Sequence, residues 1–300
     1  MKRLISADTS ELLKMNRFEL KQSIAASEGR TLLSENVAGR EAVVADITST
    51  EIAHAFGADL VLLNGVDVFE PVISGLPEQG KANNIVEQLH RLAGCPIGVN
   101  LEPVGELSEM VENQTPIAAG RQLSQATLQQ VTRQQFDFIC LTGNPGTGVT
   151  NSTIARSIRL ARDNFPGLII AGKMHSSGVS EPLITADLAR TFLAAGADIV
   201  LVPAVGTVPG VNQQMLTEIV TAVHAQGGLV MSAIGTSQEG SETDVIKRIA
   251  LTNKICGVDI QHIGDAGFGG VAPVQNIIAL SDAIRGSHHT ISRIARSINR

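Results

Sequence analysis

Short apolar runs that end in polar or glycine residues alternate with amphipathic segments along the chain. Each run is continuously apolar rather than alternating, which is typical of parallel strands buried on both faces. We count eight such runs, the first of them the weakest: residues 31–36, 59–64, 96–101, 136–142, 167–172, 197–203, 228–234 and 257–263.

The segments between the runs have helical periodicity. In residues 81–95, Ile85, Leu89 and Leu92 are spaced four and three apart, as one face of a helix requires. Three segments end in a glycine that suits a left-handed helix cap, at Gly57, Gly94 and Gly196. Strict alternation over eight units predicts an α/β fold, a (β/α)8 TIM barrel, with a doubly wound open sheet as the alternative.

The ends of the chain predict additions to this barrel. Residues 1–30 precede the first run and predict one or two extra helices that cover the bottom of the barrel, with a helix cap among residues 8–10. Residues 287–300 predict a basic amphipathic helix that packs on the barrel or on another subunit. No linker or low-complexity stretch divides residues 1–300, so we expect a single domain.

Composition narrows the classes of function. The 300 residues suit one barrel, which needs roughly 250. With 3% aromatic residues and a net charge of −6, the chain offers neither stacking surfaces for single strands nor attraction to DNA or anionic membranes. No apolar run approaches the ~20 residues of a membrane span, and the first residues lack a signal-peptide core. We therefore expect a cytoplasmic protein without nucleic-acid or membrane partners, and a homo-oligomer.

Three cysteines, Cys95, Cys140 and Cys256, lie far apart in or beside apolar runs. Their odd number and the lack of a CxxC pair favour buried thiols over disulfides or a zinc site.

Polar residues follow the strands where these barrels place their sites, at the carboxyl ends. Lys173 comes directly after the fifth run and predicts a base, a Schiff-base nucleophile or a fixed cation, while a rim salt bridge is the alternative. His175, His262 and Glu35 are the other candidate catalytic residues, the histidines as proton shuttles. Asn64, Asn100, Thr142 and Gly143 are candidate substrate contacts.

Acidic residues at neighbouring strand ends suggest a metal hypothesis. Glu35, Asp67 and Glu102 follow the first three runs, and oxygen ligands of this kind suit Mg²⁺. Asp67 and Glu102 are therefore candidate metal ligands, although no dense Asp-x-Asp motif occurs.

Three glycine-rich loops lie between a strand and a helix: residues 142–153, 235–241 and 264–270. Free backbone N–H groups at helix starts bind anions, and loops after strands 7 and 8 commonly hold phosphate in these barrels. Tight turns are the alternative. The loops predict a phosphate site at Gly235, Thr236, Gly264, Gly267, Gly269 and Gly270.

The segment TSTEIAHAFGADLVLLNGVD resembles the opening of the phosphoenolpyruvate mutase and isocitrate lyase superfamily. The whole chain is similar to a group of uncharacterised bacterial phosphonomutase-like barrels, and FDFICLTGNPGTGVTNSTIARSIRLARDNFP resembles BtpA-like barrels. The superfamily resemblance implies an Asp-x-Asp for Mg²⁺ on strand 3 and a Lys- and Cys-containing gating loop after strand 4. Here these places read GVNLEP and GNPGTGV.

Together these features predict an enzyme of lyase, aldolase or isomerase type that acts on a small phosphorylated or carboxylated metabolite. A non-catalytic ligand-binding or assembly barrel of BtpA-like kind and a hydrolase of a phosphorylated metabolite are the alternatives. No cofactor is indicated beyond Mg²⁺.

Overall fold

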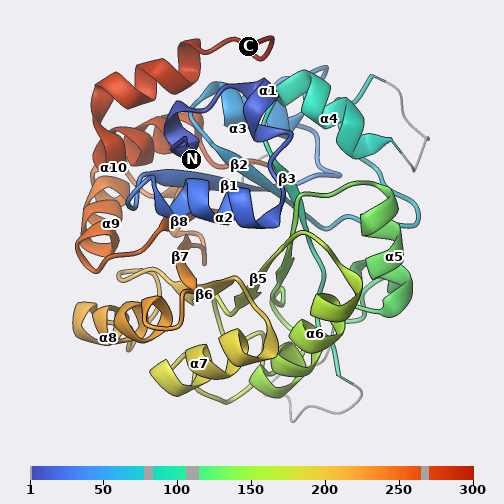
Figure 1. Cartoon of the computed structure of the whole chain (residues 1–300), viewed down its shortest axis with the longest axis vertical. Helices are drawn as coiled ribbons and strands as arrows, with labels where there is room; N and C mark the ends of the chain where they lie inside the picture. Colours follow the sequence, from blue (N-terminus) through green and yellow to red (C-terminus); the bar gives the residue numbers. More distant parts are fainter. Residues whose placement is uncertain (1, 78–83, 106–114, 265–269) are drawn as a thin grey trace.

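The eight predicted runs form a closed parallel barrel. The computed structural model describes residues 2–77, 84–105, 115–264 and 270–300 (Figure 1). The strands pair in chain order, and β1 also pairs with β8, so the sheet closes and the open-sheet alternative is wrong. The strands are β1 (Thr31–Val37), β2 (Leu60–Asn64), β3 (Ile97–Asn100), β4 (Phe138–Leu141), β5 (Leu168–Gly172), β6 (Ile199–Pro203), β7 (Leu229–Ile234) and β8 (Ile260–Ile263).

Helices surround the sheet as an outer layer (Figure 1). Gly94 and Gly196 cap two of them with φ of 69° and 114°, a left-handed conformation that Gly adopts without a Cβ penalty. The helices that follow the strands are α3 (Ser49–Ala55), α4 (Ile85–Ala93), α5 (Gln125–Arg133), α6 (Asn151–Asn164), α7 (Ala186–Ala195), α8 (Gln213–His224), α9 (Thr243–Ile255) and α10 (Val274–Ala295). Short 3-10 turns are η1 (Leu4–Ser6), η2 (Ala119–Arg121) and η3 (Gln238–Gly240).

The predicted N-terminal helices close one end of the barrel. They are α1 (Thr9–Leu12), which Asp8 begins with a capping box, and α2 (Arg17–Ala25). Leu12, Leu20 and Ile24 belong to the same apolar cluster as inward-facing strand residues such as Leu33 and Leu60. The bottom of the barrel is therefore sealed by apolar contacts.

Aspartates at the bottom of the barrel form a repeated device that the sequence analysis did not identify. An aspartate precedes each even-numbered strand, and its carboxylate accepts the backbone N–H of a residue on the preceding strand at 2.7–3.0 Å. The backbone N–H of each aspartate returns a bond to the carbonyl of that same residue. We call these four contacts the aspartate clamps: Asp59 with Leu32, Asp137 with Ile97, Asp198 with Ile169 and Asp259 with Val230.

The clamps differ in their cationic partners. Asp59 is fully buried between Arg285 and Arg293 of α10, at 2.7 and 2.8 Å. Asp198 is also buried and pairs with Arg17 of α2, at 2.7 Å, and with Arg162 of α6. These two clamps therefore also fasten the C-terminal and N-terminal helices to the barrel. Asp137 and Asp259 pair instead with the partly exposed His90 and His224.

The C-terminal helix is shorter than predicted. Helix α10 breaks at Gly286, where φ is 73° and ψ is 164°, and its second part ends at Ala295, five residues before the end of the chain. This part contacts the barrel through the buried Arg293, which pairs with Asp59. Its Ile291 and Ile294 are exposed, at 64% and 43%, and packing of this apolar face against another subunit stays a prediction. None of the helices in the described ranges is long and apolar enough to cross a bilayer.

A buried histidine at the bottom of the barrel makes stability depend on pH. His54 in α3 is 8% exposed, and its Nδ1 lies 2.9 Å from the Ala58 carbonyl. Burial, with Arg293 nearby, lowers the pKa of His54 to about 4. Between pH 6.5 and 4 the unfolded chain therefore binds a proton that the folded chain does not.

We expect this group to remove about 2–3 kcal/mol from the free energy of unfolding between pH 7 and pH 4. Urea denaturation at several pH values measures the loss. His54→Gln is the matched variant because it keeps a hydrogen-bond donor but does not titrate. The same acid sensitivity in wild type and His54→Gln would contradict the assignment.

Candidate active site at the barrel mouth

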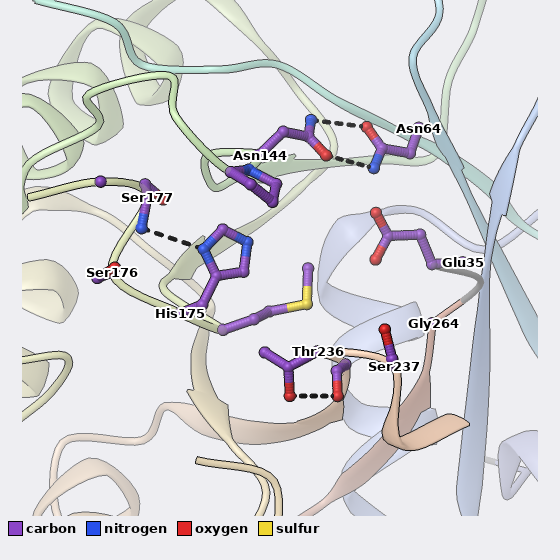
Figure 2. A pocket seen from close by; sticks show the side chains of 13 residues that line it. Glu35, Asn64, Asn144, His175, Ser176, Ser177, Thr236, Ser237 and Gly264 are labelled. Atoms are coloured by element: carbon purple, nitrogen blue, oxygen red, sulfur yellow. Dashed lines mark hydrogen bonds between the residues drawn. The ribbon is translucent and has the colours of Figure 1, made fainter. Parts of the chain in front are cut away.

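A cavity of about 390 Å³ opens at the carboxyl ends of the strands (Figure 2). Glu35 contributes from β1, Asn64 from β2, and Gly264 from the end of β8. The loops after β4, β5 and β7 supply the other walls: Asn144, Pro145, Met174, His175, Ser176, Ser177, Gly178, Gly235, Thr236 and Ser237. The cavity thus lies at the carboxyl ends of the strands, which is the end of the barrel where the sequence predicted the site.

Glu35 and His262 form a buried acid–base pair at the floor of this cavity. Glu35 Oε2 lies 2.7 Å from His262 Nε2, and the two residues are 2% and 0% exposed. Leu33 and Ile260, two residues before them, belong to the inner apolar cluster, so strand alternation also turns Glu35 and His262 inward. Neither Glu35 Oε1 nor His262 Nδ1 has a protein partner within the described part of the chain.

Three asparagines interlock along one wall. Asn64 and Asn144 exchange hydrogen bonds of 2.9 and 3.1 Å, which Figure 2 shows face to face. The Gly65 N–H donates to Asn64 Oδ1, and that bond fixes which end of the Asn64 amide is oxygen. Asn100 Nδ2 therefore donates to Asn64 Oδ1, at 3.3 Å, and Asn100 Oδ1 is left as a buried acceptor. Thr142 also turns inward, two residues after the inner-cluster residue Cys140.

His175 lies across the cavity from Glu35 (Figure 2). Its Nδ1 accepts the Ser177 N–H at 3.0 Å, so the neutral ring carries its hydrogen on Nε2. Figure 2 shows the ring on the cavity side of the loop that follows β5. The bond from Ser177 therefore sets the orientation of the His175 ring and the nitrogen that carries the hydrogen of its neutral form.

The loop after β7 has a strained backbone beside the cavity. Thr236 and Ser237 have φ of 58° and 68°, although L-residues, above all β-branched ones, rarely adopt positive φ. The Thr236 hydroxyl donates to the carbonyls of Gly235 and Thr207, which holds the loop in this form. Such strain persists where surrounding structure imposes it and clusters at functional sites. The loop presents the N–H groups of Thr236 and Ser237, which donate to no acceptor in the described residues.

The structure places Lys173 away from the expected position. The residue is fully buried, its Nζ lies 2.5 Å from Glu181 Oε1, and it does not line the cavity. The same Glu181 oxygen accepts the Asn151 N–H at the start of α6. Burial lowers the pKa of Lys173, while the hydrogen bond to Glu181 opposes that shift. Lys173 thus ties the loop after β5 to α6.

The three carboxylates of the metal hypothesis do not meet. Glu102 is held by Arg121 at 2.7 Å and by the backbone and side chain of Asn144. Asp67 caps its own loop by accepting the Phe69 N–H at 2.9 Å. In the described ranges no three His, Cys, Asp or Glu side chains are grouped so that they could hold a metal ion. Glu102 therefore orients Asn144, and Asp67 shapes a turn.

The glycines predicted to bind substrate or phosphate lie in different places. Gly235 and Gly264 line the cavity. A Cβ on Gly143 would lie 2.7 Å from Val149, so this glycine allows the loop after β4 to pack closely. Gly270 has a φ of 83°, and the next helix begins at Val274. Gly267 and Gly269 lie outside the described residues.

The residues on both sides of His175 were not predicted as site residues. Met174 before it and Ser176, Ser177 and Gly178 after it line the cavity. The signal was the Ser-Ser-Gly run itself, which is typical of a turn rich in hydroxyl and N–H donors.

Comparison with known proteins gives a family for the chain. A family model described as a domain of unknown function, DUF7916, matches residues 5–300. The chain belongs to the DUF7916 family. A comparison with curated proteins found no match to this DUF7916 chain.

Solved structures that resemble this DUF7916 chain share its fold at low identity. A designed cube-shaped, highly porous protein cage, built by fusing symmetric oligomeric domains, has a TM-score of 0.51 at 12% identity, covering 89% of this chain and 74% of its own. A thiamine phosphate pyrophosphorylase from Pyrococcus furiosus has a TM-score of 0.49 at 14% identity, with 86% and 97% covered. Oxaloacetate acetylhydrolase scores 0.49 at 14% identity, with 84% and 81% covered. The likeness extends to the barrel and no further.

Proposed function

We propose that this protein is an enzyme of lyase or isomerase type that moves a proton on a small carboxylated or phosphorylated metabolite. The observation that carries the proposal is the 2.7 Å contact between Glu35 and His262 beneath the cavity. A carboxylate hydrogen-bonded to an imidazole can accept and return a proton, which typically contributes 10²–10⁴-fold to a rate. In this proposal Glu35 takes a proton from a substrate carbon, and His262 stabilises the pair.

The opposite wall supplies the complementary group. As Glu35 removes a proton, the electron pair of the C–H bond moves toward a neighbouring carbonyl, whose oxygen gains negative charge. His175, oriented by the Ser177 N–H, donates a hydrogen bond to that oxygen. In an isomerisation the proton returns to the former carbonyl carbon, while a hydroxyl on the deprotonated carbon gives its proton to the former carbonyl oxygen and becomes the new carbonyl. In an elimination the electron pair instead expels a leaving group from the carbon on the other side of the deprotonated carbon, which leaves a C=C bond beside the restored carbonyl.

The anionic end of the substrate is assigned to the loop after β7. No lysine or arginine occurs among the described residues that line the cavity, so backbone and hydroxyl donors must hold the anion. The N–H groups and hydroxyls of Thr236 and Ser237 are of this kind, and Gly235 lets a ligand approach the backbone. Lys173 is proposed as a positioning residue, because its ammonium holds Glu181 and, through it, the start of α6.

Proton exchange tests the proposal before a reaction is known. The protein is incubated in D₂O with a panel of small carboxylated and phosphorylated metabolites, with MgCl₂ or with EDTA, and followed by proton NMR. We expect carbon-bound hydrogen in one of them to exchange or the compound to turn over. Saturable binding of a panel member with neither exchange nor turnover would favour the non-catalytic barrel. Exchange or turnover that occurs with MgCl₂ but not with EDTA would show that the reaction requires Mg²⁺.

A further inference from the structure

The floor of the barrel mouth carries buried polar atoms that no described residue satisfies. Glu35 Oε1, Asn100 Oδ1 and Thr142 Oγ1 are buried and have no hydrogen-bond partner within the described residues. Burying such an atom without a partner is costly, and in native proteins nearly all of them are satisfied. We call these three atoms the floor oxygens.

The floor oxygens come from β1, from β3 and from the residue directly after β4, and their side chains share one face of the sheet. Leu33 of β1 and Cys140 of β4 lie two residues before Glu35 and Thr142, and both belong to the inner apolar cluster. Of the three residues only Glu35 lines the cavity itself, and Asn100 of β3 lies one contact behind that lining, against Asn64. Since side chains alternate between the two faces of a strand, all three atoms belong to residues that point toward the barrel axis.

The hydrogen-bond network decides what these atoms can bind. The amide of Asn100 must present its oxygen, because its nitrogen is committed to Asn64 Oδ1. A carboxylate oxygen of Glu35 only accepts while it is ionised, and the Thr142 hydroxyl can accept. The set is therefore rich in acceptors, and the group that satisfies it must bring donors.

We propose that the floor oxygens form a subsite for hydroxyl groups of the substrate, so that the ligand is a polyhydroxylated acid or phosphate ester. This proposal rests on the proposed function in one respect: the anionic end of the substrate is taken to bind at the loop after β7. Hydroxylated carbons then reach down toward Glu35, which is where the proton would be removed. A site built to hydrogen-bond a hydroxyl strongly rejects an analogue that lacks it.

Matched pairs of probes test the subsite by isothermal titration. One pair is glycerol 3-phosphate with propyl phosphate, and the other is erythronate with butyrate. The two members of a pair have the same carbon chain length and the same anionic group, and they differ in their hydroxyl groups. We expect the hydroxylated member of a pair to bind at least about tenfold more tightly. Equal affinities within the pairs, or no binding of either hydroxylated probe at millimolar concentration, would overturn the proposal.

Thr142→Val is the decisive variant because it replaces the hydroxyl by a methyl group of similar size. We expect it to remove most of the preference for the hydroxylated probe, whereas Thr142→Ser keeps it. Without probe, Thr142→Val should have an equal or higher Tm, since the lost hydroxyl has no hydrogen-bond partner among the described residues. An unchanged preference in Thr142→Val would show that the hydroxyl has a structural role only.

Thr31→Val is the matched control. Thr31 begins β1, lies on the same face as Leu33, and also has a buried Oγ1 without a described partner, but it lies at the sealed end of the barrel. Thr31→Val should therefore leave Tm equal or higher, as Thr142→Val does, and should leave the preference for the hydroxylated probe unchanged. Titration with MgCl₂ alone is run in parallel, because hard cations also bind such oxygens. A magnesium signal that depends on Thr142 without any probe would overturn the hydroxyl assignment.

These outcomes separate the subsite from the proposed function. If the paired probes bind equally while proton exchange still depends on Glu35, the subsite is wrong and the proton-transfer enzyme stands. If the preference holds but no metabolite exchanges a proton, the subsite belongs to a binding protein.

Discussion

Glu35→Gln is expected to lower kcat by about 10²–10⁴-fold while the fold persists. The amide of glutamine can still accept a hydrogen bond from His262 Nε2, so the contact that buries the pair survives. It cannot accept a proton from a substrate carbon. The measurement is the rate of turnover, or of deuterium exchange, of the metabolite that the NMR panel identifies.

Asp67→Asn is the matched control for this experiment. Asp67 is also a carboxylate near a strand end, but it accepts the Phe69 N–H in a turn and does not line the cavity. Asparagine can make the same turn, so the rate should stay within about twofold of wild type. A Glu35→Gln variant that retains full activity would remove the proton-transfer mechanism.

Asp59→Ala is expected to lower the free energy of unfolding by about 3–5 kcal/mol. The substitution leaves Arg285 and Arg293 buried without their counter-ion, and it frees the N–H of Leu32. Burial lowers the pKa of Arg285, and the charge of Asp59 is the main influence that opposes this shift. Urea denaturation of the variant gives the difference in free energy.

A second aspartate clamp provides the control for Asp59→Ala. Asp259 makes the same bond to the strand before it, through the Val230 N–H at 2.8 Å. Its ionic partner His224 is 42% exposed, so the histidine remains solvated when the carboxylate is lost. Asp259→Ala should therefore cost only about 1–2 kcal/mol. Equal losses at the two clamps would show that the buried arginines contribute little.

The architecture followed from the sequence because parallel strands buried on both faces read as unbroken apolar runs. Even the weakest run, residues 31–36, forms β1, which is the longest of the strands at seven residues. That run looked weak because it carries Ser34, Glu35 and Asn36, and Glu35 belongs to the site. The chain thus departs from the apolar pattern where one of its candidate functional residues lies.

The site followed from the sequence only in part. Position at a strand end pointed to Glu35 and Asn64, which line the cavity, and to His262, which contacts Glu35. It also pointed to Lys173, which does not line the cavity, because the rule ignores the direction of the side chain. In β5, Ile170 faces the barrel interior and Ala171 faces the surrounding helices. Because side chains alternate along a strand, Lys173, two residues after Ala171, also points outward toward the helices. Applied to the sequence, this alternation predicts that the Lys173 side chain points away from the barrel mouth.

The partners of Glu102 and Asp67 could not be foreseen in the same way. Glu102 is held by Arg121, nineteen residues later, and by Asn144 from the next loop. Such contacts depend on how loops fold over one another, and no periodicity in the sequence records them. A carboxylate at a strand end is therefore a weak sign of a metal ligand.

The aspartate clamps also bear on the width of the entrance at the other end of the barrel. Each clamp joins an aspartate to one residue of the neighbouring strand and so fixes the stagger between the two strands. In a closed barrel the staggers add up to the shear, and the shear together with the number of strands determines strand tilt and radius. A slip of one pair by two residues would change that radius and move Glu35 relative to His175. Side chains that never meet a ligand thus set the diameter of the opening through which it enters.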